Sequence, residues 1–171
     1  MKKVLMLVDE LYEDFELHYP KIRLEENGIS VVIVGLEKKV YHGKKGLFVE
    51  SDTTYDQINI DEYAGVIIPG GFAPDFLRRY KQVLNILKKY NDENKLIAFI
   101  CHAGWVPISA NILHGRRATS FIAIKDDMIN AGTLWEDSSV VIDNNLVSSR
   151  NPSDLGDFCK GILQVLSAQS K

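Results

Sequence analysis

The sequence contains little cysteine or histidine. Its 171 residues include two cysteines, Cys101 and Cys159, which lie far apart, and four histidines with no pair at metal-binding spacing. This pattern gives neither a disulfide framework nor a zinc signature. A G-x-G-x-x-G fingerprint is also missing after every apolar run, so nothing indicates a dinucleotide. We therefore expect no metal, no cofactor and reduced thiols.

No sign of charge dominates, and long apolar runs are absent. Lys and Arg total 20 and Asp and Glu total 23, for a net charge of -3. This balance supplies no basic field for nucleic acid or an anionic membrane. The first apolar run, Val4–Val8, is too short for a membrane span or a signal-peptide core. We expect a soluble, cytoplasmic protein that binds neither nucleic acid nor membrane.

The residues that are present are typical of a globular protein. The composition is 46% hydrophobic and 25% charged, and the length predicts one domain over residues 1–171. Short apolar runs alternate with amphipathic stretches, and four of these runs have the unbroken apolar character of buried parallel strands. These four are Val4–Val8, Val31–Val34, Ala64–Ile68 and Leu96–Ile100. The alternation predicts an α/β fold with a mostly parallel central sheet and helices on both faces.

Further elements follow from periodicity and from turn residues. We predict helices over 15–27, 74–90, 102–113, 125–130 and 152–166, hairpins over 41–51 and 139–149, and a short strand over 119–121. Ligands of open parallel sheets bind beyond the carboxyl ends of the strands. Three loops leave that edge, namely Asp9–Asp14, Gly70–Asp75 and Cys101–Gly104, so we expect them to meet.

Cys101 ends a predicted strand and begins a predicted helix. A thiol at such a turn is exposed at the sheet edge, as in a nucleophile elbow, and the helix N-terminus is expected to lower its pKa. Cys159 instead shares a helical face with Leu155, Ile162 and Leu166. This placement predicts that Cys159 packs in the core.

Groups that could assist the thiol occupy all three loops. Backbone N–H groups of Gly71 and His102 could form an oxyanion hole, and His102 is the histidine placed to act as a base. A carboxyl from the first loop could serve as acid or base. The residues alone do not choose among its candidates, which are Asp9, Glu10, Glu13, Asp14 and Glu16.

Several segments together resemble the PfpI family. They span residues 12–20, 69–75, 98–104, 119–120, 124–132 and 148–152. These proteins are the intracellular-protease-like members of the superfamily that includes the parkinsonism-associated deglycase and has the fold of class I glutamine amidotransferases. The match runs in one register from Val4 to Leu166. It implies a flavodoxin-like three-layer α/β/α sandwich.

The resemblance also implies roles for individual residues. Cys101 is the matching nucleophile, and Glu13 matches a buried carboxyl that is hydrogen-bonded to the sulfur. His102 matches the family histidine, and the amides of Gly71 and His102 match the oxyanion hole. Asp75 matches an acidic residue that orients this histidine from a neighbouring subunit, which implies a homo-oligomer, either a dimer or a hexamer.

The sequence departs from the family pattern at three places. Ala103-Gly104 stands where Gly-Pro is usual, and Phe121-Ile122 where Tyr-Pro is common, which removes a hydroxyl near the pocket. Asp75 stands where Glu is common, so its reach is shorter by one methylene. We expect Gly70, Trp105 and Phe121 to line the substrate pocket.

Three functions fit these residues. The first is a cofactor-free enzyme of glyoxalase III or deglycase type, in which Cys101 adds to methylglyoxal-type aldehydes as a protection against stress. The second is an intracellular cysteine peptidase that acts on a peptide-like substrate. The third is a redox sensor or chaperone whose Cys101 oxidises to a sulfinate. A glutaminase would need a His-x-Glu motif near the C-terminus, but no histidine follows His114.

Overall fold

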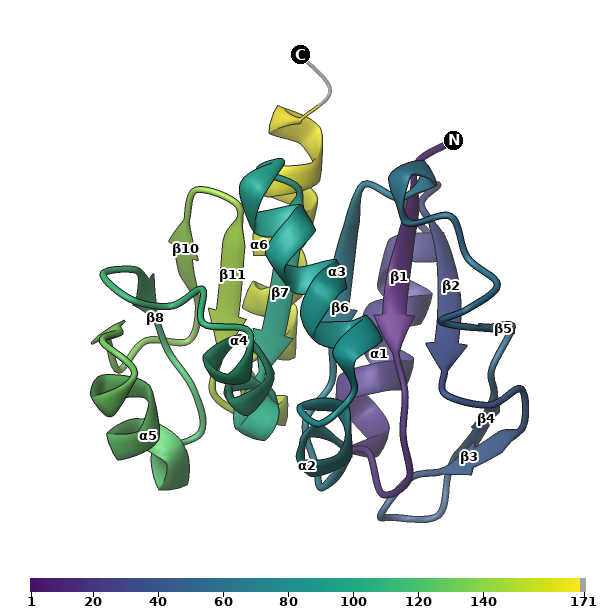
Figure 1. The fold of residues 1–171 in the computed structure, drawn as a ribbon, viewed down its shortest axis with the longest axis horizontal. Coiled ribbons are helices and arrows are strands. Elements are labelled where there is room, and N and C mark those ends of the chain that lie inside the picture. The colour runs from purple at the N-terminus through teal and green to yellow at the C-terminus, as the bar shows by residue number, and fades with distance from the viewer. Residues whose placement is uncertain (170–171) are drawn as a thin grey trace.

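A seven-stranded sheet lies at the centre of the computed structural model, which describes residues 1–169 (Figure 1). The strand order is β10-β11-β7-β6-β1-β2-β5, and all neighbours are parallel except the pair β10 and β11. The strands are β1 (Lys3–Leu7), β2 (Ser30–Gly35), β5 (Thr53–Thr54), β6 (Gly65–Ile68), β7 (Leu96–Ile100), β10 (Val141–Asp143) and β11 (Leu146–Ser149).

Helices cover both faces of this sheet, which makes a three-layer sandwich. In Figure 1 α2, α3 and α4 lie in front of the sheet and α1 and α6 behind it. Every residue of β6 and β7 is buried, because a parallel sheet between two helical layers meets no water on either side. The helices are α1 (Asp14–Glu25), α2 (Ala73–Leu77), α3 (Lys81–Asp92), α4 (Trp105–Ser109), α5 (Lys125–Asn130) and α6 (Leu155–Ala168).

Smaller elements lie outside the central sheet and the six helices. They are the antiparallel hairpin β3 (Val40–His42) and β4 (Phe48–Glu50), the parallel pair β8 (Arg117–Ala118) and β9 (Leu134–Trp135), and 3-10 turns at Ile60–Glu62, Cys101–Gly104, Ile122–Ile124 and Pro152–Asp154.

The predicted architecture is confirmed, since the four apolar runs form β1, β2, β6 and β7 and both predicted hairpins are present. The prediction of one helix over 74–90 was wrong. That segment is divided into α2 and α3 because Tyr80 has an extended backbone, with ψ of 119°. The Tyr80 hydroxyl donates to the buried Asp9 carboxylate over 2.8 Å, which fixes this break against the end of β1.

Two further predictions differ from the structure. The helix expected to run to residue 113 ends at Ser109, and Asn111 then adopts a left-handed φ of 57° that a helix cannot continue through. The short strand expected over 119–121 is absent. There the Thr119 N–H donates to the Ser148 hydroxyl over 2.9 Å, a side-chain partner in place of a strand ladder.

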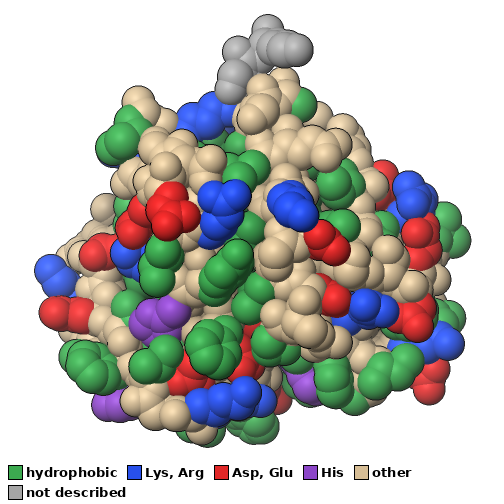
Figure 2. All heavy atoms as spheres, turned by 180° about the vertical axis from the view of Figure 1, so that it is seen from behind, with side chains coloured by type: hydrophobic (Ala, Val, Ile, Leu, Met, Phe, Trp, Pro, Cys, Tyr) green, Lys and Arg blue, Asp and Glu red, His purple; other side chains and the backbone are tan. Residues whose placement is uncertain are grey.

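The outer side of the helical layer behind the sheet is partly apolar. Figure 2 shows hydrophobic side chains among charged ones on this face, and the exposed large side chains of α1 are Phe15, Tyr19 and Ile22. Within residues 1–169, no helix has both the length and the apolar character to cross a bilayer.

Candidate active site

Cys101 forms the predicted elbow at the carboxyl end of β7. It is the first residue of a 3-10 turn, its φ is 63°, and the residue is only 7% exposed. A left-handed φ at a residue with a side chain costs about 1–3 kcal/mol, so the surrounding contacts must hold it. One of these is the N–H of Phe121, which donates to the Cys101 carbonyl over 3.2 Å.

The carboxyl beside the thiol belongs to Glu16. Glu16 is completely buried in the first turn of α1, and its Oε2 accepts the Gly70 N–H over 2.7 Å. The carboxyl lies close enough to the Cys101 thiol for each group to shift the pKa of the other. Gly70 lies between the two groups: a Cβ on it would be 2.5 Å from Glu16 Oε2 and 2.8 Å from Cys101 Cβ. Only glycine allows this close approach.

The expectation that Glu13 bonds to the sulfur was wrong. Glu13 is the N-cap of α1, and its Oε2 accepts the Glu16 N–H over 2.9 Å. Its Oε1 lies 3.1 Å from the Lys45 ammonium. An N-cap side chain turns back toward the free N–H groups of its helix, whereas a residue three positions later lies one turn inside. The spacing of Glu13 and Glu16 was a signal in the sequence for this cap, and sequence reasoning did not use it.

Burial keeps the Glu16 carboxyl protonated near neutral pH. Desolvation raises its pKa to about 8, and the negative charge of Glu13 acts in the same direction. The Gly70 hydrogen bond opposes this rise. At pH 7 the larger fraction of Glu16 is therefore a carboxylic acid, which has a proton to donate.

The Cys101 pKa is raised, not lowered as the sequence predicted. Desolvation raises it to about 12, and the charge of ionised Glu16 adds to the rise. The N–H groups of His102 and Gly71 act in the opposite direction. A single 3-10 turn does not offset the loss of water around a thiol that is 7% exposed. Once Glu16 is protonated, its repulsion disappears, so the thiol and carboxyl titrate as a coupled pair.

The two amides expected at the oxyanion hole both interact with the Cys101 sulfur. Gly71 has a φ of 78°, and a Cβ there would be 2.4 Å from the Glu13 nitrogen. Tyr12 forms β-bridges with Gly71 on one side and with Gly43 of the β3–β4 hairpin on the other. The segment after β1, the segment after β6 and the β3–β4 hairpin therefore lie side by side next to the site.

His102 adjoins the thiol, with Nδ1 3.2 Å from the Cys101 sulfur. Its ring stacks on Phe121 at a centroid distance of 5.0 Å and meets Trp105 edge-on at 5.4 Å. Burial lowers the His102 pKa, and the positive charge of Lys44 lowers it further. A neutral imidazole next to the thiol can accept its proton.

The other predicted site residues differ in what they contact. Gly70 lies near Cys101, since a Cβ on it would be 2.8 Å from Cys101 Cβ. Trp105 and Phe121 instead contact His102 and also line separate cavities of about 420 and 170 Å³. Asp75 faces outward and pairs with Arg79 over 3.1 Å. Within a single subunit it does not contact His102 in the part of the chain that the structure describes.

Sequence reasoning missed the contribution of the β3–β4 hairpin, which lies outside the three loops. Lys44 affects the pKa values of both Glu16 and His102, and its ammonium has no ion pair within residues 1–169. The buried Asp14 carboxylate accepts the N–H groups of Lys45 and Leu47, each over 2.8 Å, and thereby fixes the hairpin loop. The pattern Gly43-Lys44-Lys45-Gly46 gave the turn but not its contact with the site.

Comparisons with known proteins show the family of this chain. Residues 2–165 match the DJ-1/PfpI family. Deglycase PfpI of Pyrococcus furiosus is 44% identical over 164 residues, which cover 96% of this chain and 99% of that protein. YraA of Bacillus subtilis, named as a candidate cysteine protease, is 36% identical, and the match covers 96% of this chain and 98% of YraA.

Solved structures show the same fold. A two-domain protein with DJ-1/ThiJ/PfpI-like and ferritin-like domains from Anabaena variabilis has a TM-score of 0.95 at 38% identity. The match covers 98% of this chain and 48% of that one, so this chain spans about half of that protein. Drosophila melanogaster DJ-1beta has a TM-score of 0.91 at 26% identity, and the match covers 96% and 90% of the two chains. The chain therefore belongs to the DJ-1/PfpI family.

Proposed function

We propose that this protein is a cysteine-dependent, cofactor-free enzyme that acts on methylglyoxal-type aldehydes, free or as adducts on amino groups. The observation that carries the proposal is the buried pair of Glu16 and Cys101, with His102 Nδ1 3.2 Å from the sulfur. The arrangement combines a nucleophile, a proton donor and a proton acceptor around one atom. The relatives named deglycase support the same reaction class.

The reaction follows from these three groups. The Cys101 sulfur bonds to the aldehyde carbon of methylglyoxal while its proton passes to His102, and Glu16 protonates the carbonyl oxygen to give a hemithioacetal. The Glu16 carboxylate then removes the proton on this carbon while protonated His102 gives a proton to the neighbouring carbonyl oxygen, which forms an enediol. The hydroxyl group on the first carbon next returns a proton to His102 and the second carbon takes a proton from Glu16, so the first carbon is oxidised, the second is reduced and both side chains regain the protonation states they had in the hemithioacetal. The resulting lactyl thioester is hydrolysed by water, which releases lactate and the thiol. Methylglyoxal and one water thus give lactic acid, and no external oxidant is needed.

The amides of Gly71 and His102 suit the charged stages of this sequence. Both lie close enough to affect the pKa of Cys101. An oxygen bonded to the carbon on that sulfur would be within reach of the same two donors. Donors that are fixed in a site from which water is excluded stabilise developing oxyanions by several kcal/mol.

Peptide cleavage is the second candidate, and the contact of the Cys101 sulfur with His102 favours it. A peptidase also needs a group that orients the histidine. We propose that Asp75 supplies this group from a second subunit, in a homo-oligomer. Its carboxylate is 44% exposed and pairs with the exposed Arg79, so it is accessible to another chain.

Proton NMR of the protein with methylglyoxal in amine-free buffer tests the proposal. We expect lactate from the unmodified protein and none from Cys101→Ala, and a matched Cys159→Ala protein should still produce it. If neither the unmodified protein nor Cys159→Ala forms lactate, the aldehyde proposal is wrong. Cleavage of a fluorogenic peptide that is lost in Cys101→Ala and in Asp75→Asn would then support the peptidase.

A further inference from the structure

A second cavity lies next to the proposed catalytic centre. It has a volume of about 170 Å³ and an aromatic and aliphatic wall. Its lining residues are Ser120, Phe121, Ile122, Trp135, Asp137, Arg150 and Asn151. This volume suits one amino-acid side chain rather than a whole drug-sized ligand, which needs several hundred Å³.

The backbone places this cavity beside Cys101. Ser149 of β11 pairs with Ile100 of β7, so Arg150 and Cys101 leave adjacent parallel strands at the same edge. The Phe121 N–H donates to the Cys101 carbonyl over 3.2 Å, and the Phe121 ring stacks on His102. Phe121 therefore belongs to both the cavity wall and the catalytic centre. A substrate bonded to Cys101 could place its neighbouring side chain in the cavity.

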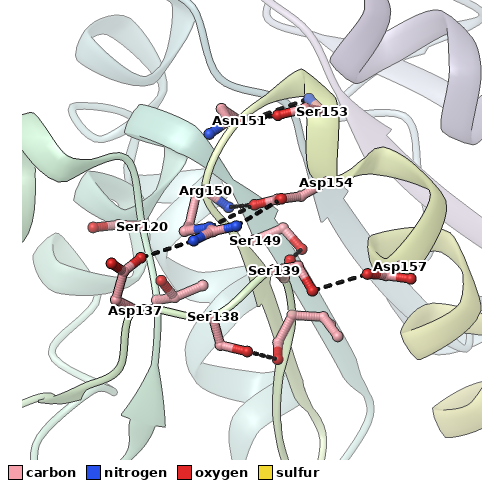
Figure 3. A network of polar contacts seen from close by, with 12 residues as sticks. Ser120, Asp137, Ser138, Ser139, Ser149, Arg150, Asn151, Ser153, Asp154 and Asp157 are labelled. Atoms are coloured by element: carbon pink, nitrogen blue, oxygen red, sulfur yellow. Dashed lines mark hydrogen bonds and ion pairs between the residues drawn. The ribbon is translucent and has the colours of Figure 1, made fainter.

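The polar groups of the cavity differ in whether protein hydrogen bonds already occupy their charged atoms. Figure 3 shows Arg150 between Asp154 and Asp137, with Ser120 on the side of Asp137. Arg150 bonds to the buried Asp154 through two nitrogens, at 2.9 and 3.0 Å, and to Asp137 Oδ1 through a third, at 2.8 Å. Asp137 is 67% exposed, and its Oδ2 has no hydrogen bond within the described residues. Asp137 therefore keeps an accessible carboxylate oxygen that a cationic group can approach.

The apolar wall also favours a cation. Trp135 is anchored by its indole N–H, which donates to the Ser120 hydroxyl over 3.0 Å. The Lys125 ammonium lies 5.0 Å from the Trp135 ring centroid. Lys125 thus shows that an ammonium is stable against this ring, and it would compete with a ligand that brings its own cation. Methylene groups can pack on Phe121 while the cationic end reaches Asp137.

We propose that this cavity is a substrate subsite for a side chain with an apolar stem and a cationic end, of the lysine or arginine type. The proposal rests on the proposed function, because it places this side chain next to the carbonyl carbon that Cys101 attacks. It goes further by assigning the preference to Asp137 and Trp135, which neither the mechanism nor the sequence analysis used.

A matched pair of peptide aldehydes tests the preference. N-acetyl-norleucinal and N-acetyl-trimethyllysinal have the same four-carbon stem, and only the second ends in a cation, one that cannot cyclise. Hemithioacetal formation with each, labelled with ¹³C at the aldehyde carbon, gives their dissociation constants by NMR. We expect the cationic aldehyde to bind about three- to tenfold more tightly. Asp137→Asn should remove the difference, and Lys125→Gln should enlarge it.

Asp126→Asn is the matched control, since it removes an exposed carboxylate on α5 that does not line the cavity. It should keep the difference. Equal affinity of the two aldehydes for the unmodified protein, or tighter binding of norleucinal, would overturn the inference. Hemithioacetal formed equally with both would leave the proposed function intact while it removes the subsite.

A second readout does not depend on reaction at Cys101. In Cys101→Ala, the amides N-acetyl-trimethyllysine amide and N-acetyl-norleucine amide are titrated while the Trp135 indole ¹H–¹⁵N signal is followed. The chain has two tryptophans, so Trp135→Phe assigns the signal. We expect the cationic amide to shift the Trp135 signal and Asp137→Asn to weaken that response. An unshifted Trp135 signal would overturn the subsite even if the aldehydes react. A shifted signal without hemithioacetal would support the subsite and contradict the proposed nucleophile.

Discussion

The two cysteines of this protein are both buried, and yet only one is placed for chemistry. Cys101 is 7% exposed and Cys159 is 0% exposed, and burial raises the pKa of each to about 12. Cys159 lies on the buried side of α6, and the charge of Arg23 lowers its pKa against the effect of burial. Cys101 is surrounded by a carboxyl, an imidazole and two N–H groups. Burial therefore does not distinguish Cys101 from Cys159. What distinguishes Cys101 is the set of neighbouring groups that can accept, donate or hold a proton.

The largest effect is expected when each cysteine is replaced by alanine. Cys101→Ala should lower kcat/KM for methylglyoxal by at least about a thousandfold, because the nucleophile is lost. Cys159→Ala should retain activity and lower the free energy of unfolding by about 1–2 kcal/mol, because it leaves a small cavity in the core. Steady-state kinetics and urea unfolding measure the two effects. Equal loss of activity in both variants would contradict the contrast.

The next largest effect should separate the two glutamates. Glu16→Gln should lower kcat/KM by about a hundredfold or more, because an amide cannot transfer the proton. Glu13→Gln should lower it less than tenfold and lower stability by about 1 kcal/mol or less, because Gln still offers an oxygen to the helix N–H. Kinetics and thermal unfolding of the two variants make the comparison. A larger rate loss for Glu13→Gln than for Glu16→Gln would show that Glu13 supplies the catalytic carboxyl.

The Glu16 pKa also predicts how stability depends on pH. Its pKa is about 8 in the folded protein and 4.5 as the ordinary value, so between these values the folded state binds more protons than the unfolded state. This contribution is fully present below pH 4.5 and is lost as the pH rises through about 8. The loss amounts to a few kcal/mol by the usual conversion.

Urea unfolding at pH 5 and at pH 8.5 measures this loss. Glu16→Gln should flatten the dependence, whereas Glu13→Gln should reduce it only in part, because it removes the Glu13 charge but leaves the desolvation of Glu16. An unchanged slope in Glu16→Gln would show that other groups carry it.

The smallest effect on stability is expected for Asp75→Asn. Its ion pair with Arg79 is exposed, and such pairs contribute about 0–1 kcal/mol. If Asp75 acts across an interface, the variant should keep its oligomeric state by light scattering and lose activity severalfold, with an altered pH profile because His102 loses its partner. Full activity of Asp75→Asn would show that Asp75 has no role in catalysis.

The sequence predicted the elements of the fold better than it predicted the chemistry of the site. Apolar runs and turn residues were sufficient for the four central strands and for the elbow at Cys101, because these depend on local pattern. Glu13 and Glu16 are three residues apart in the same acidic segment, and only the start of α1 decides which one becomes the cap. The Cys101 pKa depends on desolvation by distant segments, which no local pattern reports.

The cavity beside Phe121 was beyond sequence reasoning for a similar reason. Its wall combines residues from positions 120–122, 135–137 and 150–151, which meet only when β11 pairs with β7. The resemblance indicated Phe121 as a pocket residue. It gave no sign of Asp137, whose accessible oxygen depends on the way Arg150 divides its hydrogen bonds.

Tyr12 gives the β3–β4 hairpin an unexpected constraint on its length. Tyr12 forms bridges with both Gly43 of the hairpin loop and Gly71 next to the thiol. The Asp14 carboxylate also accepts the N–H groups of Lys45 and Leu47. These contacts connect the hairpin loop to the backbone beside Cys101. Most surface loops accept insertions freely. This one would transmit each added residue to the position of the Gly71 amide. Loop grafts between relatives should therefore succeed only when the segment from Gly43 to Leu47 keeps its length.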